Sequence, residues 1–168
     1  TIFNIFHKHA DRVRIANIAQ LVNVLQALFL TEGDKMLLTP TYHVFDMYKV
    51  HQDATMLPID ISSPVYSRLG KEIKSVSASA SKDDNGKIHV SFVNIDPNQS
   101  AEIVCNIKDV DNARFVSGNI ITAPRTDSHN TFEKPDEVVL KEFKDANIKN
   151  GVLTVKVPAK SLVTVELN

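Results

Sequence analysis

The sequence predicts a mainly β protein in which an antiparallel β-sandwich or barrel over residues 57–168 follows a smaller α/β region over residues 1–56. Three observations support this prediction. Short runs of alternating apolar residues recur from residue 75 onward, separated by turn signals, which is typical of sandwiches and barrels. The first 56 residues instead combine helical spacing, one short apolar run and a helix-start signal. A composition of 43% hydrophobic and 23% charged residues is ordinary for a folded protein.

The α/β region reads as helix, strand, loop and helix. Residues 13–20 form a short apolar run, as expected for a strand that is buried on both faces. At Thr39 a hydroxyl N-cap is followed by proline in the first helical position, which predicts that a helix begins there. The apolar face of a helix over residues 1–10 is expected to contain Ile2, Ile5, Phe6 and His9. The helix after Thr39 is expected to bury Thr41, Val44, Phe45 and Tyr48.

This region is too small to be stable by itself, because one buried strand and two helices leave their apolar faces uncovered. We expect the sandwich, a second copy of the chain or another part of the protein to cover it. The apolar side chains that need covering are Ile15, Ile18, Val44, Phe45 and Tyr48.

Alternating strands predict the second region. Residues 83–86 read Asp-Asp-Asn-Gly, a hairpin signal between two alternating runs. Residues 123–149 show no clear period, and we expect a long excursion with one strand near residues 138–143. Strands are expected at residues 75–81, 88–92, 103–107, 113–122, 151–157 and 162–167. Their predicted core is Val76, Val90, Phe92, Ile103, Val155 and Val165.

Charge and composition argue against several classes of partner. A formal net charge of −1 gives no reason to expect nucleic acid. No apolar run approaches the roughly 20 residues of a membrane helix. Cys105 is the single cysteine, so an internal disulfide and a cysteine-rich metal site are excluded. No signal peptide is recognised, and a cytoplasmic protein is favoured over a secreted one.

Other pairs of polar residues are interpreted as structural or solvent-exposed, not as functional sites. His43 and His51 are about two helical turns apart with no third ligand nearby, so we expect no metal site. Glu32 and Asp34 flank Gly33 and are interpreted as a solvated turn. No glycine-rich phosphate loop is present, and no cofactor is expected.

Several motifs appear in the order known from one enzyme family. They are His-Ala-Asp-Arg-Val at residues 9–13, Ala-Gln-Leu-Val-Asn at 19–23, Thr-Pro-Thr-Tyr-His-Val-Phe at 39–45, Asn-Thr-Phe-Glu-Lys-Pro at 130–135 and the ending at 157–165. In this order they resemble family 51 glycoside hydrolases, the α-L-arabinofuranosidases. The resemblance covers most of the chain and is strongest over residues 7–53.

The resemblance implies that residues 1–56 are the last part of a catalytic (β/α)8 barrel and that residues 57–168 are a jelly-roll-like sandwich. The family hydrolyses terminal α-L-arabinofuranosyl residues from arabinan, arabinoxylan and related oligosaccharides, with retention, through two glutamates. Both would lie upstream of Thr1, so this chain would contain no catalytic residue and would be inactive alone.

Gln20 is the family position that this chain does contain. The resemblance implies that it contacts the arabinose of the innermost subsite. If residues 13–19 are a barrel strand, Gln20 lies at the strand's carboxyl end, where barrel active sites are built. Its carboxamide both donates and accepts hydrogen bonds, which suits a sugar hydroxyl.

The alternative is a non-catalytic β-sandwich module for carbohydrate binding or for oligomerisation. The chain has no tryptophan, and Tyr66 is the single tyrosine beyond residue 56, which argues against a sugar-stacking platform. A role in covering the barrel and forming a homo-oligomer is compatible with the enzyme hypothesis.

Overall fold

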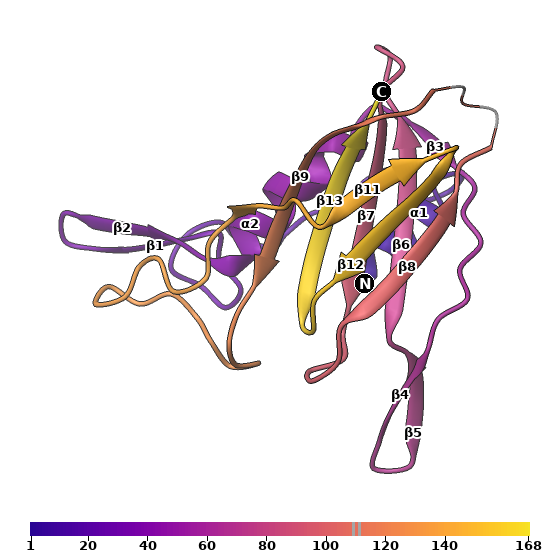
Figure 1. The fold of residues 1–168 in the computed structure, drawn as a ribbon. Coiled ribbons are helices and arrows are strands. Elements are labelled where there is room, and N and C mark those ends of the chain that lie inside the picture. The colour runs from indigo at the N-terminus through magenta and orange to yellow at the C-terminus, as the bar shows by residue number, and fades with distance from the viewer. Residues whose placement is uncertain (109, 111) are drawn as a thin grey trace.

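Two antiparallel sheets packed face to face form the centre of the computed structural model, which describes residues 1–108, 110 and 112–168 (Figure 1). The larger sheet has the strand order β10 (Lys141–Glu142), β9 (Phe115–Thr122), β13 (Ser161–Leu167), β7 (Ile88–Asn94), β6 (Val76–Lys82) and β3 (Thr55–Leu57). The smaller sheet has the order β11 (Ala146–Lys149), β12 (Val152–Val157) and β8 (Ala101–Asn106). The predicted mainly β class with a C-terminal antiparallel sandwich is therefore confirmed.

The inner faces of the two sheets share one apolar core. Phe92 is 1% exposed, and Val155 and Val165 are completely buried. Ile103 is half-buried and packs against this core, and Val90 and Val76 are buried as predicted. Every second residue of β7 and β13 points inward, so the alternation in the sequence correctly identified the core.

The helices cover the outer face of the larger sheet. In Figure 1 the smaller sheet lies in front of the larger one, and α1 (Ile2–Lys8) and α2 (Pro40–Tyr48) lie behind it. Helix α1 contacts β6, α2 contacts β9 and β13, and η1 (Lys49–His51) contacts β6. None of the described helices is long and apolar enough to cross a membrane. The sandwich is thus one of the covers that the α/β region was expected to need.

Helix α2 begins where the sequence predicts. The backbone N–H of Tyr42 donates to Thr39 Oγ1 at 3.4 Å, and Pro40 occupies the first helical position. Tyr48 is buried and Val44 is half-buried against a second apolar cluster, as expected for this face. The buried members of this cluster are Met47, Tyr48, Ile121, Val138 and Leu162.

The predicted apolar face of α1 is wrong. Ile2 and Ile5 are 66% and 52% exposed, whereas Asn4 is buried against the sheet. The reason lies in the sheet, since the outer face of β6 presents serine hydroxyls that the carboxamide of Asn4 can bind. The covered face of α1 therefore combines Asn4 and His7 with Phe3, which packs against the second apolar cluster.

The strand predicted over residues 13–20 is also wrong in this structure. The segment is irregular and mostly exposed, with Ile15 76% exposed. A parallel strand needs hydrogen-bonding neighbours along its edges. Within the described part of the chain no strand runs beside this segment.

Two exposed hairpins were not predicted. One pairs β1 (Phe29–Glu32) with β2 (Lys35–Leu38). Gly33 and Asp34 form its exposed tip directly after Glu32, which confirms the predicted turn. The other pairs β4 (Val65–Arg68) with β5 (Lys71–Lys74) and projects from the end of the sandwich (Figure 1).

Smaller features refine the boundaries. The hairpin turn at residues 83–86 is present, with Gly86 at a positive φ of 84°. The strand expected near residues 138–143 is the two-residue β10, and β11 lies in the excursion where none was predicted. Strand β3 spans the predicted boundary between residues 56 and 57, because Met56 pairs with Ser81 and Leu57 with Ala80.

Candidate functional site

Segments far apart in the sequence meet at the base of the β1–β2 hairpin. The carbonyl oxygen of Leu21 accepts hydrogen bonds from the backbone N–H groups of Leu28 and Phe29, at 2.9 and 3.0 Å. Phe29 pairs with Leu38 across the hairpin. The side chain of Asn130 donates to the carbonyl oxygen of Leu38 at 2.8 Å. Three motifs noted in the sequence, at residues 19–23, 39–45 and 130–135, are therefore neighbours in the fold.

Gln20 lies at the point where the irregular segment ends and this anchored region begins. Its side chain is exposed. The next residue, Leu21, is held by the two backbone hydrogen bonds to Leu28 and Phe29. A carboxamide in this position can reach a molecule or another chain segment that covers this surface.

Asn23 shapes the turn that follows Gln20. It has a positive φ of 54°, a conformation that asparagine tolerates better than most residues. Its Nδ2 donates to Thr31 Oγ1 at 2.9 Å, and the backbone N–H of Thr31 donates to Asn23 Oδ1 at 2.7 Å. The turn is thereby tied to β1.

Thr39 connects the same turn to the start of α2. In addition to capping the helix, its hydroxyl donates to the carbonyl oxygen of Ala27 at 2.7 Å. Its backbone N–H donates to the carbonyl oxygen of Leu28 at 3.0 Å. Since α2 packs on the larger sheet, the sandwich fixes the position of the turn after Gln20.

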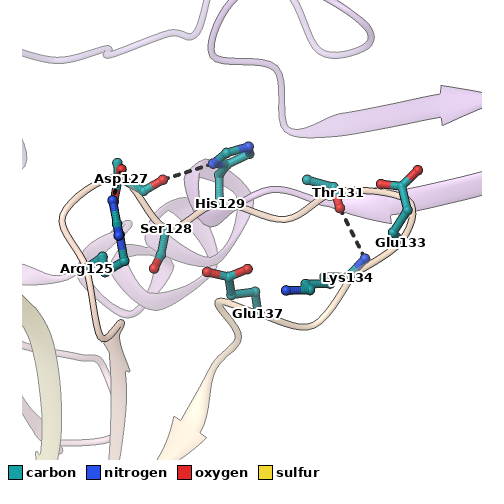
Figure 2. A pocket seen from close by; sticks show the side chains of 8 residues that line it. All are labelled: Arg125, Asp127, Ser128, His129, Thr131, Glu133, Lys134 and Glu137. Carbon is teal, nitrogen blue, oxygen red and sulfur yellow. Dashed lines mark hydrogen bonds and ion pairs between the residues drawn. The ribbon is translucent and has the colours of Figure 1, made fainter.

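The loop that contains Asn130 also encloses a shallow depression of about 440 Å³ (Figure 2). Arg125 makes a bidentate pair with Asp127, with both N–O distances at 2.8 Å, and this lowers the pKa of Asp127 to about 2. The pKa of Glu133 is lowered by its own backbone N–H and by the hydroxyl of Thr131. The acid of a glycosidase needs a raised pKa instead, so these carboxylates do not suit that role.

A polar layer separates α1 from the larger sheet. Asn4 Nδ2 donates to Ser77 Oγ at 3.0 Å, and Asn4 Oδ1 accepts from Tyr48 OH at 2.7 Å and from Ser79 Oγ at 2.9 Å. His7 Nδ1 lies 3.0 Å from Ser79 Oγ. The carboxamide of Asn4 thus joins both helices to β6.

His51 is the second centre of this layer. Its Nδ1 and Nε2 lie 2.7 Å from the hydroxyls of Ser81 and Ser91 respectively, and its ring centroid lies 4.8 Å from that of His7. Burial lowers the pKa of His51 to about 3, with smaller contributions from His7 and His89.

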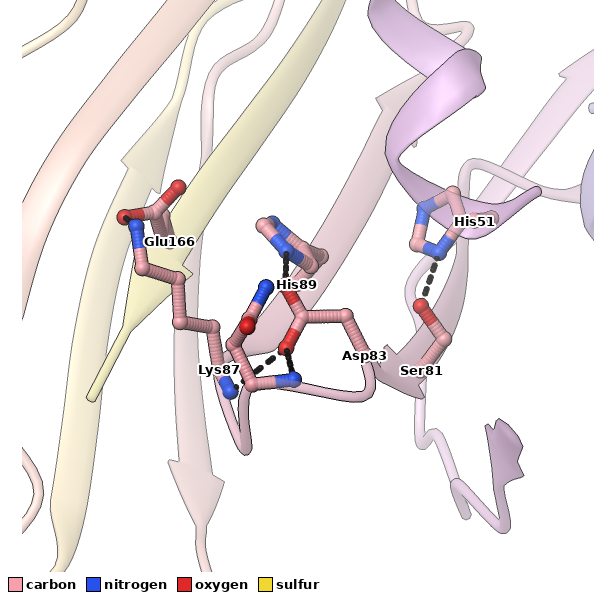
Figure 3. A network of polar contacts seen from close by, with 7 residues as sticks. His51, Ser81, Asp83, Lys87, His89 and Glu166 are labelled. Carbon is pink, nitrogen blue, oxygen red and sulfur yellow. Dashed lines mark hydrogen bonds and ion pairs between the residues drawn. The ribbon is translucent and has the colours of Figure 1, made fainter. Parts of the chain in front are cut away.

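Charged groups border this layer at one end (Figure 3). Asp83 Oδ2 lies 3.5 Å from His89 Nε2, and Lys87 pairs with Glu166 at 2.7 Å. Among the described residues, no three His, Cys, Asp or Glu side chains gather as ligands of a metal ion would. The layer is a hydrogen-bonded histidine–serine interface between the helices and the sheet.

Sequence reasoning missed both networks. The polar layer had a visible signal, because serine occupies every second position from Ser75 to Ser81 on the face opposite Val76 and Ala80. Asn130 had a weaker one, since it was noted only as part of a motif. His7 and His51, which are far apart in the sequence, lie side by side.

Comparisons with known proteins agree over nearly the whole chain. Residues 1–161 match the family described as the α-L-arabinofuranosidase C-terminal domain. An intracellular exo-α-L-arabinofuranosidase of Bacteroides ovatus is 49% identical over 165 residues, which are 98% of this chain and 32% of that protein. An intracellular exo-α-(1→5)-L-arabinofuranosidase of Streptomyces lividans is 24% identical over 149 residues, 88% of this chain and 22% of the relative. The chain spans about a third of the length of the first relative and less of the second.

Solved structures show the same relationship. The crystal structure of the family 51 arabinofuranosidase from Xanthomonas axonopodis pv. citri matches with a TM-score of 0.95 and 43% identity, over 99% of this chain and 34% of that one. The arabinose complex of an α-L-arabinofuranosidase from Thermotoga maritima has a TM-score of 0.84 at 22% identity, over 98% of this chain and 36% of that one, which shows a shared fold.

Proposed function

Because the chain belongs to the α-L-arabinofuranosidase C-terminal domain family, the C-terminal part of family 51 glycoside hydrolases, we propose that it completes a retaining α-L-arabinofuranosidase. In this proposal the chain supplies Gln20 to the arabinose subsite. The sandwich holds Gln20 in place, and the glutamates that act as acid/base and nucleophile lie on a part of the enzyme outside this chain.

The observation that carries the proposal is the contrast between Gln20 and the residues that follow it. The side chain of Gln20 is exposed, whereas Leu21, Asn23 and Thr39 around it are fixed by hydrogen bonds. A fixed backbone that presents an exposed carboxamide is suited to binding a sugar hydroxyl in one orientation.

The exposed segment before Gln20 fits the same role. Residues 13–20 carry the apolar run of a barrel strand, and pairing with neighbouring barrel strands would satisfy their backbone groups. The same part of the enzyme would cover Ile15, which is 76% exposed, and Leu25, which is 93% exposed. We propose residues 1–56 as the end of the barrel and residues 57–168 as the sandwich domain.

The substrate class follows from the named relatives. Both are exo-acting α-L-arabinofuranosidases, one for the α-(1→5) linkage, so we propose terminal α-L-arabinofuranosyl groups of arabinan, arabinoxylan and related oligosaccharides as substrate. Both relatives are named intracellular, which supports a cytoplasmic enzyme acting on imported oligosaccharides.

A contribution of the sandwich to a homo-oligomer is the second proposal for this chain. The β4–β5 hairpin supports it, because Leu69 at the hairpin tip is 91% exposed and Val65 and Ile73 are 57% and 51% exposed. Sedimentation of the complete protein, with and without the Leu69→Ser substitution, tests this proposal. An oligomer that dissociates in the variant supports it, and a monomeric wild type refutes it.

The enzyme proposal makes a direct prediction. This chain alone should not hydrolyse an aryl α-L-arabinofuranoside, whereas the complete protein should. In the complete protein, Gln20→Ala should lower kcat/KM by an amount that corresponds to a loss of roughly 1–3 kcal/mol in transition-state stabilisation, the range for one buried hydrogen bond. The Tm should change little. Gln52→Ala, an exposed glutamine after η1, is the matched control. Normal kinetics in Gln20→Ala would refute the assignment of Gln20.

A further inference from the structure

We propose that Asn130 is a positioning residue for Gln20, acting through the base of the β1–β2 hairpin from a loop on the other side of it. The inference rests on the proposed function of Gln20. It assigns a kinetic role to a buried residue that would not itself touch the sugar.

The hydrogen bonds of Asn130 leave its side chain a single orientation. It is 4% exposed, and its Nδ2 donates both to Leu38 O at 2.8 Å and to Val138 O at 2.9 Å. Its Oδ1 accepts from the backbone N–H of Val138 at 2.7 Å. Because both hydrogens of the amide are used, a rotated side chain would lose all three bonds. Asn130 therefore fixes the end of β2 relative to the loop.

Two connections lead from the end of β2 to the backbone beside Gln20. Leu38 pairs with Phe29, whose N–H donates to Leu21 O at 3.0 Å. The next residue, Thr39, donates its hydroxyl to Ala27 O at 2.7 Å. A shift of Leu38 would therefore move the turn on both sides, and a displacement of even ~1 Å in a positioning group is costly for catalysis.

Asn94 provides a matched comparison within the same chain. It is 2% exposed, and its Nδ2 lies within hydrogen-bond distance of the carbonyl oxygens of Gln99, Val157 and Pro158, at 2.8, 3.3 and 3.1 Å. Its Oδ1 accepts from the backbone N–H of Asp96 at 3.0 Å. Asn94 fixes a turn as Asn130 does, but that turn joins strands of the sandwich. If Asn130 had a purely structural role, substitutions of Asn130 and Asn94 would have the same effects on amide exchange near Gln20 and on catalysis.

The first experiment measures hydrogen exchange in this chain. Asn130→Ala should speed exchange of the amides of Leu28, Phe29 and Thr39 by about tenfold or more, because their opening becomes easier. Asn94→Ala should leave these amides unchanged. Equal effects of both substitutions, or no effect of Asn130→Ala, would overturn the inference. If the alanine variant does not fold, the same measurement is made on Asn130→Ser, which removes the amide that donates to Leu38 O and Val138 O but keeps a small polar side chain.

The second experiment measures coupling in the complete enzyme. Asn130→Ala should lower kcat by about fivefold or more when Gln20 is present and have a much smaller effect in a Gln20→Ala background. Asn94→Ala should have the same effect in both backgrounds. A full Asn130→Ala effect without Gln20 would overturn the inference. A Gln20→Ala variant with normal kinetics would instead defeat the proposed function, and the exchange result would stand independently.

Discussion

Around β6 and β7 the two faces of the larger sheet are built from different chemistry, whereas α2 packs on β9 and β13 through the second apolar cluster. On the inner face, Phe92 and Val165 meet β12 in a core that excludes water, with Leu153 and Val155 completely buried. On the outer face, serine, histidine and asparagine side chains join β6 and β7 to the helices over much of the contact. The same strands therefore take part in an apolar interface on one side and a hydrogen-bonded interface on the other.

The two kinds of interface differ in what they contribute, because one stabilises the sandwich and the other helps to position the helices on it. Apolar packing is strong but tolerates small changes of position, whereas hydrogen bonds are satisfied in few arrangements. The inner core stabilises the sandwich. On the outer face the polar layer positions α1 on β6, and the hydrogen bond from Tyr48 to Asn4 adds a defined contact to the apolar packing of α2. Because α2 leads back through Thr39 to the turn after Gln20, alignment of the helices is the property that the proposed site needs.

The largest expected effect is in the inner core. Leu153→Ala should lower the free energy of unfolding by roughly 2–5 kcal/mol, the usual range for a buried leucine. Leu25→Ala, at a leucine that is 93% exposed, should change it by less than about 0.5 kcal/mol. Urea denaturation of this chain compares the two, and similar losses would mean that the sandwich is not the dominant stabilising unit.

The next largest effect is the pH dependence of stability that His51 gives to the outer layer. The pKa of His51 falls from an ordinary 6.5 to about 3 on folding. As the pH is lowered, His51 is therefore protonated in the unfolded chain before it is protonated in the folded one. The stability from His51 is fully present above pH 6.5 and is lost as the pH falls toward 3. At pH 5 the loss should be roughly 2 kcal/mol.

Urea denaturation from pH 7.5 to 4.5 measures this loss. The variant His51→Gln should show a flatter dependence on pH, while the exposed His129→Gln serves as a control. Identical slopes in the wild type and in His51→Gln would show that His51 is not buried in its neutral form.

The smallest effect concerns one hydroxyl of the outer layer. Tyr48→Phe removes the hydrogen bond to Asn4 Oδ1 but leaves Ser79 as a donor to the same oxygen. We expect a loss of about 0.5–1.5 kcal/mol, with faster amide exchange in α1 and unchanged exchange in β13. Tyr66→Phe, in the β4–β5 hairpin, is the matched control. Faster exchange throughout the sandwich would contradict the separation of the two interfaces.

The alternating strands were predictable because a buried face repeats every second residue. Val76, Val90 and Phe92 were identified from this pattern alone. The same reasoning was wrong for residues 13–20, where an apolar run indicated a strand, because pairing depends on neighbouring strands and none runs beside this segment in the described part of the chain. The face of α1 was missed for a related reason, since Asn4 is buried by the serines of β6 and not by its own helical pattern.

The candidate site was predictable only in part. Gln20 came from a motif, and its contact with sugar stays a prediction. The role of Asn130 depends on three backbone groups, and no local pattern links Asn130 with Leu38. Contacts of this kind arise from the path of the backbone, which local sequence patterns do not reveal.

The position of β13 has a consequence for how the protein is made. It follows every other strand in the chain, yet it lies between β9 and β7 in the larger sheet. A growing chain that has not yet produced β13 therefore holds two half-sheets with open edges, a form that invites wrong pairing and that chaperones shield. A premature stop before Ser161 would not yield a slightly shorter protein, since both halves of the sheet would lose the strand that joins them.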